Sequence, residues 1–126
     1  MSLSRRQARR QAIFLLYRWD LSGQEIGSQY AGEIDPWSRA MAEAVAARAA
    51  ELDARITDAA EGWTADRLGA VERSALRVAV HELQTREVPA EVAINEAVTF
   101  AKRYSTDEAG RLVNGILGRI QREEAA

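Results

Sequence analysis

Apolar residues recur at every third or fourth position along most of this chain of 126 residues, and that spacing limits the fold more than any other feature. Side chains three and four residues apart share one face of an α-helix, whereas a half-buried strand needs strict alternation. Only two prolines and eight glycines interrupt the pattern. The sequence therefore predicts one all-α domain of six or seven helices.

The first helix has clear start and stop signals. Ser4 can cap the free N–H groups of a helix that begins just after it and runs to about Leu21. Gly23 follows, and glycine often ends a helix because it tolerates a left-handed backbone. Three glycines in residues 22–34 then predict a loop.

A second start signal is the pair Asp35 and Pro36, since Asp caps free N–H groups and Pro suits the first helical position. The apolar spacing after this pair continues until Gly62, which predicts one long helix. Later helix starts are predicted at Thr64 (a short helix to Leu68), after Gly69, after Pro89, and at Ser105, where Glu108 completes a capping box.

Composition excludes most enzyme chemistry. The chain has no cysteine and a single histidine, His81, so no cysteine or multi-histidine metal site can form. No glycine loop for nucleotide phosphates is present, and no nucleophile, base and orienting group can be assembled around His81. We therefore expect no catalytic residue, no metal and no cofactor.

With no apolar run of roughly 18 residues and no secretory cleavage site, a cytoplasmic location is expected.

The charge distribution singles out the amino-terminal end. Residues 1–18 contain five arginines and no acidic residue, while residues 19–66 contain ten acidic residues and three arginines. The start of the first helix holds Arg5, Arg6, Arg9 and Arg10. The helix dipole disfavours cations at this end, and a phosphate-binding patch would account for them, because guanidinium groups bind phosphate oxygens in pairs. A solvated helix face is the alternative, and the sequence leaves it open.

Glu72 is a second unusual residue, because it falls on the apolar arc of the fourth predicted helix together with Leu76 and Leu83. A carboxylate seldom enters an apolar face without a partner. Glu72 can serve as a cap in the first turn after Gly69, or it can present its charge to a partner protein. Both interpretations stay open on sequence grounds.

Three motifs cover most of the chain: RRQARRQAIFLLYRWDLSG, DRLGAVERSALRVAVHEL and VPAEVAINEAVTFAKRYSTDEAGRLVNGIL. Together they resemble the NusB family of bacterial transcription antitermination factors. The resemblance implies about seven helices in two small packed bundles, formed by residues 1–62 and 63–126. It also implies binding to the single-stranded boxA RNA of ribosomal RNA operons together with NusE, a ribosomal small-subunit protein, in an antitermination complex with RNA polymerase.

The resemblance also assigns site residues, motif by motif. The RNA-binding side chains would be Arg5, Arg6, Arg9 and Arg10 at the start of the first helix, and Glu108, Arg111 and Leu112 at the start of the last. The NusE-facing side chains would be Tyr17, Asp66 and Glu72. Because the family includes both monomers and homodimers, a homodimer that covers the RNA-binding face is a further expectation.

Two other functions compete with antitermination. A helix-turn-helix DNA regulator needs a basic recognition helix after a tight turn, whereas the helix after Gly69 has mixed charge and a wide apolar arc. A NusB-like RNA-binding adaptor in ribosomal RNA processing or modification fits the same motifs. The chain ends at Ala126 without a cofactor-binding domain, so antitermination is the preferred expectation.

Overall fold

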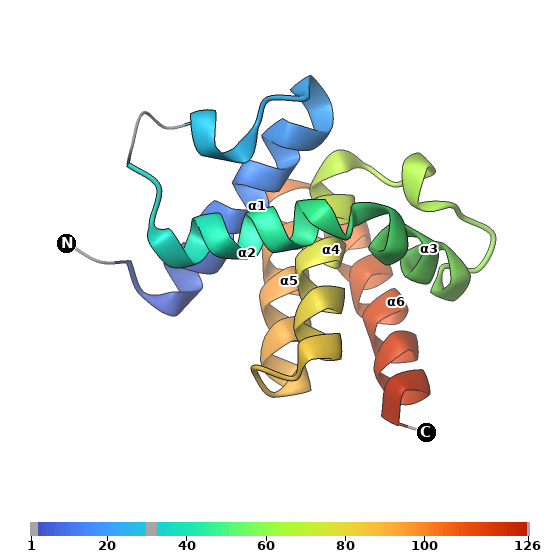
Figure 1. The fold of residues 1–126 in the computed structure, drawn as a ribbon. Coiled ribbons are helices and arrows are strands. Elements are labelled where there is room, and N and C mark those ends of the chain that lie inside the picture. Colours follow the sequence, from blue (N-terminus) through green and yellow to red (C-terminus); the bar gives the residue numbers. More distant parts are fainter. Residues whose placement is uncertain (1–2, 30–32, 126) are drawn as a thin grey trace.

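Six α-helices and two short 3₁₀ turns make up the part of the chain that the structure, a computed structural model, describes (Figure 1). The described residues are 3–29 and 33–125. The elements are α1 (Arg5–Ser22), η1 (Ile26–Ser28), α2 (Pro36–Ala47), α3 (Ala49–Ala59), η2 (Ala65–Arg67), α4 (Ala70–Thr85), α5 (Ala90–Tyr104) and α6 (Asp107–Ala125). These residues contain no strand, which confirms the all-α prediction. None of the described helices has the length and apolar character needed to cross a membrane.

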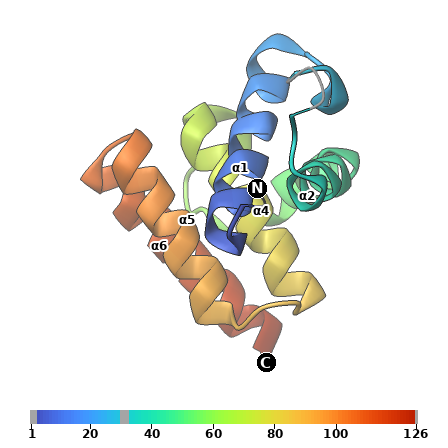
Figure 2. The same cartoon turned by 90° about the vertical axis from the view of Figure 1, so that its left-hand side faces the viewer.

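Helix α4 occupies the centre of the fold and contacts the other five described helices (Figure 1). Its wide apolar arc requires such surroundings, because a helix that is apolar over much of its circumference must pack on several neighbours. Figure 2 shows α5 and α6 as neighbours on one side of the fold, with α2 on the opposite side. One continuous cluster of buried apolar side chains fills the space between the helices. The predicted division into two bundles at residue 62 falls between α3 and η2 and stays a prediction.

The first helix begins at the predicted residue and ends within one residue of the predicted end. Ser4 Oγ accepts a hydrogen bond from the Gln7 N–H (3.1 Å), and Gln7 Oε1 accepts one from the Ser4 N–H (2.9 Å). Gly23 has a φ of 73°, and its N–H donates to the Trp19 carbonyl (2.9 Å). Glycine suits this left-handed position because it has no Cβ to clash with the backbone.

The single long helix predicted between Pro36 and Gly62 is wrong, because two helices, α2 and α3, meet at Arg48. The Asp35 cap is confirmed, since its side chain accepts hydrogen bonds from two N–H groups of the first turn. Arg48 has a φ of −106° and a ψ of 12°, outside helical geometry. Helix α2 packs mainly on α1 whereas α3 packs on α4 and α6, and one straight helix could not follow both surfaces.

The last helix begins one residue later than predicted. Thr106 is the cap, because its Oγ1 accepts a hydrogen bond from the Ala109 N–H (3.0 Å). Ser105 still belongs to the end of α5, where its N–H donates to the Ala101 carbonyl (2.9 Å). The predicted capping box between Ser105 and Glu108 is therefore wrong, and the Glu108 side chain is exposed.

The short helix predicted between Thr64 and Leu68 is the 3₁₀ turn η2. The Thr64 side chain makes no capping hydrogen bond there. The N–H of Ala65 instead donates to Thr57 Oγ1 of α3 (2.9 Å), so a side chain from the preceding helix takes the place of the predicted cap.

Candidate nucleic-acid interface

The four arginines at the start of α1 point to two different sides of the helix. Successive residues of an α-helix are rotated by about 100°, so Arg5 and Arg9 share one side while Arg6 and Arg10 share another. Packing then decides which guanidinium groups stay at the surface. Arg5 and Arg6 are exposed, Arg10 is half-buried and Arg9 is buried.

Arg9 does not lie at the surface where the sequence led us to expect it. Its Nε and Nη2 donate to the two carboxylate oxygens of Glu82 on α4, at 2.9 and 2.8 Å. Only 4% of the Arg9 side chain and 1% of the Glu82 side chain are exposed. A buried carboxylate needs a charged or hydrogen-bonding partner, and Arg9 supplies one. Arg9 therefore holds α1 to α4, and the predicted RNA contact has to come from the other arginines.

The other three arginines of this group keep contact with solvent. The Arg5 guanidinium lies 4.3 Å from the ring centroid of Trp37 on α2, a cation–π contact. Arg6 Nε donates to Glu96 Oε1 on α5 at 2.8 Å, and 67% of the Arg6 side chain remains exposed. Arg10 makes no ion pair or side-chain hydrogen bond with a residue that the structure describes. Because an exposed ion pair is weak in water, a phosphate can compete with Glu96 for Arg6.

Helix α5 adds two cations in its last turn, which lies next to the middle of α1. Phe14 of α1 packs on Phe100 and Tyr104 of α5, with ring centroids 5.0 and 4.9 Å apart, so the last turn of α5 lies next to α1. Lys102 and Arg103 of that turn are exposed. The sequence does not single them out, because the helix dipole alone accounts for cations in a last turn. We call these exposed or half-buried cations of α1 and α5 the basic face: Arg5, Arg6, Arg10, Lys102 and Arg103.

The second predicted RNA-binding segment lies at the start of α6. Glu108 and Arg111 are exposed there, and Leu112 is half-buried against the core. Helix α5 lies between α1 and α6 in Figure 2, so the two predicted segments are separated by one helix. The Lys102 side chain packs across Gly110 of α6. A Cβ at residue 110 would overlap the Lys102 side chain. The last turn of α5 thus contacts α1 at Phe14 and the start of α6 at Gly110.

The residues expected to face NusE come from three elements that Arg73 joins. Tyr17 is half-buried near the end of α1, Asp66 is exposed in η2, and Glu72 is half-buried in the first turn of α4. Arg73 of α4 forms an ion pair with Asp20 of α1 and donates to two backbone carbonyls in and after η2. The end of α1, η2 and the start of α4 therefore lie together.

Glu72 bends back over the start of its own helix. A Cβ on Gly69 would overlap the Glu72 carboxylate, so the glycine makes room for it. This position suits an acidic group near a helix start, yet no side-chain capping hydrogen bond forms at Gly69. Nearby, a hydrogen bond with Thr64 is the main cause that lowers the pKa of Asp66, and the exposed carboxylate stays anionic. Both charges remain available to a partner.

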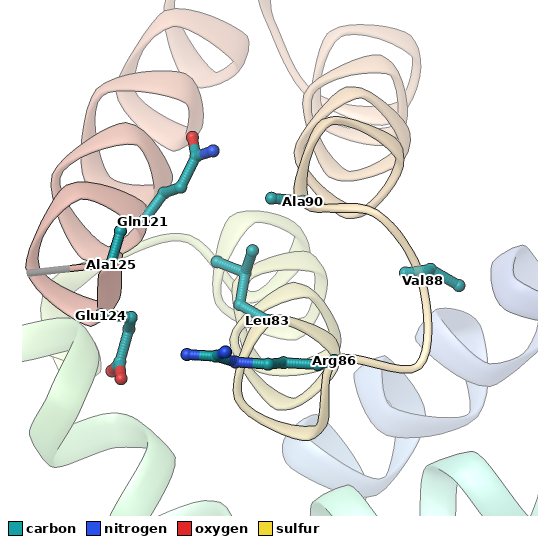
Figure 3. Close-up of a pocket in the computed structure, with 7 residues that line it drawn as sticks. All are labelled: Leu83, Arg86, Val88, Ala90, Gln121, Glu124 and Ala125. Carbon is teal, nitrogen blue, oxygen red and sulfur yellow. The ribbon is translucent and has the colours of Figure 1, made fainter.

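A separate hollow of about 450 Å³ lies between the end of α4, the start of α5 and the end of α6 (Figure 3). Leu83, Arg86 and Glu124 are among the residues that line it. Glu124 already pairs with Arg55 of α3, Oε1 to Nε, at 3.2 Å. The hollow offers no nucleophile next to a base. Within residues 3–29 and 33–125, no group of three or more metal-binding side chains occurs.

A family model described as the NusB family matches residues 6–122. The chain belongs to the NusB family. This NusB-family chain is 41% identical to the transcription antitermination protein NusB of Rubrobacter xylanophilus over 122 residues, which cover 91% of this chain and 88% of that protein. The structure of T. maritima NusB matches it with a TM-score of 0.85 at 30% identity, covering 98% of this chain and 94% of that one.

A chain in the crystal structure of antitermination factors NusB and NusE in complex with dsRNA also matches. The TM-score is 0.81 and the identity 29%, and the match covers 94% of this NusB-family chain and 96% of that one. These comparisons confirm the family resemblance and the helical fold expected from the sequence. The site residues stay predictions. The geometry leaves as candidates for RNA or NusE contacts those predicted residues whose side chains reach the surface.

Proposed function

We propose that this NusB-family protein is a transcription antitermination factor that binds boxA RNA together with NusE and joins an antitermination complex on RNA polymerase. It acts by binding alone, catalyses no reaction and works in the cytoplasm. A relative of known structure was solved with NusE and dsRNA, which supports this choice of partners. The observation that carries the proposal is the basic face, because its cations remain at or near the surface after folding.

The basic face holds RNA mainly through the sugar-phosphate backbone. The forked N–H groups of Arg5, Arg6 and Arg10 bind phosphate oxygens in pairs, and such contacts position a strand without reading its sequence. Sequence is then read from unstacked bases, since single-stranded RNA exposes their edges. Glu108 and Leu112 at the start of α6 are the side chains we assign to base contacts.

Competition binding tests this function directly. Labelled boxA RNA is bound to the protein, with and without NusE, and is then displaced by unlabelled boxA RNA, by scrambled RNA or by duplex DNA. We expect boxA RNA to displace the label at the lowest concentration. Equal displacement by duplex DNA would contradict the proposal and favour a DNA-binding regulator.

The NusE-facing surface is tested by Glu72→Lys. The reversed charge should abolish binding of NusE while leaving the affinity of the free protein for RNA unchanged. Lysine also opposes the helix dipole at the start of α4, so a control is needed. Glu91→Lys makes the same change in the first turn of α5 and should leave NusE binding intact. If Glu72→Lys bound NusE as tightly as the wild type, Glu72 would not contact NusE and would act only at the start of its own helix.

A further inference from the structure

A groove outside the basic face runs between the end of α3 and helix α6. Its volume is about 420 Å³. Trp63 and Glu61 line the α3 side, and three arginines line the α6 side: Arg111, Arg119 and Arg122. The groove therefore combines an aromatic side chain with an excess of positive charge, although neither feature belongs to the basic face.

Two of the three arginines have no partner among the residues that the structure describes. Arg111 and Arg122 are eleven residues apart, so they project from the same face of α6 about 16 Å from each other. Both are exposed, and neither forms an ion pair or side-chain hydrogen bond with a described residue. Arg119, between them, is held by Glu61 (Nη1 to Oε1, 3.1 Å) and by Glu123 (Nε to Oε2, 3.3 Å).

Trp63 leaves half of its surface, 50%, open to solvent beside these arginines. The floor of the groove is also open, because a Cβ built on Gly115 meets no atom within 4 Å. An exposed aromatic ring next to a row of cations is the arrangement by which proteins hold single-stranded nucleic acid: bases stack on the ring and phosphates pair with the cations.

We infer that this groove is a second contact for single-stranded RNA, which continues from the start of α6. The inference rests on the proposed function, because Arg111 belongs both to the groove and to the predicted RNA-binding segment. One base stacks on Trp63, and phosphates further along the strand in each direction pair with Arg111 and Arg122. An acidic protein segment would also match the charge, but the apolar floor at Leu112 and Ile116 is too short to bury the face of a helix.

The experiment compares boxA RNA alone with boxA RNA that carries a short uridine tail at its 5′ or its 3′ end. We expect one of the two tailed RNAs to bind the wild-type protein roughly fivefold or more tightly than boxA RNA alone, the gain of about one stacked base. Trp63→Ala and Arg122→Gln should each remove this gain and leave the affinity for boxA RNA alone unchanged. Trp63→Phe should keep most of it, since a ring remains for stacking.

Arg86→Gln is the matched control, because Arg86 is an exposed arginine that lines the hollow of Figure 3 rather than the groove. It should keep the full gain. A tail that adds no affinity at either end, or a gain that survives Trp63→Ala, would overturn the inference alone. The inference would also be overturned if neither tail added affinity and a poly-glutamate peptide bound to the wild type but not to Trp63→Ala. Failure of boxA RNA alone to bind the wild type would overturn the proposed function as well.

Discussion

Arg9 and Arg10 are adjacent in the sequence but have opposite environments. Arg9 is buried in an ion pair with Glu82, whereas Arg10 reaches solvent. Removing one member of a buried ion pair leaves a charge without compensation in apolar surroundings, while a change at a more exposed residue has little effect on folding. The two residues therefore allow folding and RNA binding to be separated by experiment.

Arg9→Ala is expected to lower the free energy of unfolding by about 3–5 kcal/mol, because Glu82 would stay buried without its partner. Arg10→Ala is expected to change it by no more than about 0.5 kcal/mol. Urea unfolding followed by far-UV circular dichroism measures both values. Equal losses in the two variants would mean that Arg9 and Glu82 do not form the buried pair.

His81 gives a prediction about pH. Burial is the main cause that lowers the pKa of His81 below its ordinary value of 6.5, and the charge of Arg48 adds to it. Arg48 Nη1 lies 2.8 Å from His81 Nδ1, and arginine can only donate, so the folded state favours the neutral ring. The unfolded chain then binds a proton more readily, and stability falls as the pH drops below about 6.5 and through the folded pKa.

The measurement is urea unfolding of the wild type and of His81→Gln at about pH 7.5 and about pH 5.5. We expect the wild type to lose more stability on acidification than the variant, because glutamine does not titrate. An identical loss in both proteins would assign the pH dependence to other groups.

The sequence predicts the two sides of the first helix but not the environment of each arginine. Helical spacing alone places Arg5 with Arg9 and Arg6 with Arg10. It cannot show that Glu82, 73 residues further along the chain, lies buried opposite Arg9. Such a pair depends on the tertiary arrangement of α1 and α4. The exposure of the Trp63 side chain likewise depends on the path of the chain between α3 and η2, which local sequence does not give.

At the level of elements, Ser105 in the turn between α5 and α6 can serve either as the end of α5 or as the cap of α6. Ser105 and Thr106 can both cap a helix, and the spacing from Ser105 to Glu108 favours the first of them. The structure uses Ser105 to end α5, so only Thr106 is free to begin α6. A local pattern cannot reveal this, because it does not say where the preceding helix stops.

Substitution distinguishes the two capping assignments. Thr106→Ala is expected to lower the free energy of unfolding by about 1 kcal/mol, because the Ala109 N–H loses its acceptor. Ser105→Ala is expected to cost less than about 0.5 kcal/mol. Thermal or urea unfolding measures both. A larger loss for Ser105→Ala would restore the capping box predicted from the sequence.

Helix starts that depend on a nearby side chain are predicted well, as Ser4 and Asp35 show. The break at Arg48 is not, because alanines flank it and none of them disfavours a helix. It arises where the chain has to leave the surface of α1 and follow α4 and α6. Boundaries imposed by packing lie beyond what local sequence can specify.

At the scale of the whole molecule, the start of α1 lies apart from the NusE-facing residues. The basic face includes the start of α1, and the NusE-facing residues include Tyr17 near its end. Arg5 and Tyr17 are twelve residues apart, which corresponds to about 18 Å along the helix axis. RNA bound at the start of α1 therefore leaves the end of this helix open to NusE, as a joint complex requires.

Self-association is a property of the whole molecule that the family resemblance implies. A homodimer that covers the basic face would exclude RNA, so boxA RNA should shift any dimer toward the RNA-bound monomer. Light scattering with and without boxA RNA measures the mass of each species. A dimer that binds RNA without dissociating would show that its interface lies elsewhere.

The central claim is that the basic face neutralises RNA phosphates, and the salt dependence of binding tests it most directly. The affinity for boxA RNA is measured at several salt concentrations for the wild type and for Arg6→Gln/Arg10→Gln. Arg39→Gln/Arg86→Gln is the control, since it removes the same charge from exposed arginines outside the basic face.

If four or five phosphates are neutralised, the logarithm of the wild-type affinity should fall with the logarithm of salt concentration at a slope of roughly −3, from about −0.7 per contact. The Arg6→Gln/Arg10→Gln slope should be shallower by roughly 1.4, for two lost contacts, and the control slope should match the wild type. A wild-type slope near zero, or the same slope in all three proteins, would contradict the claim.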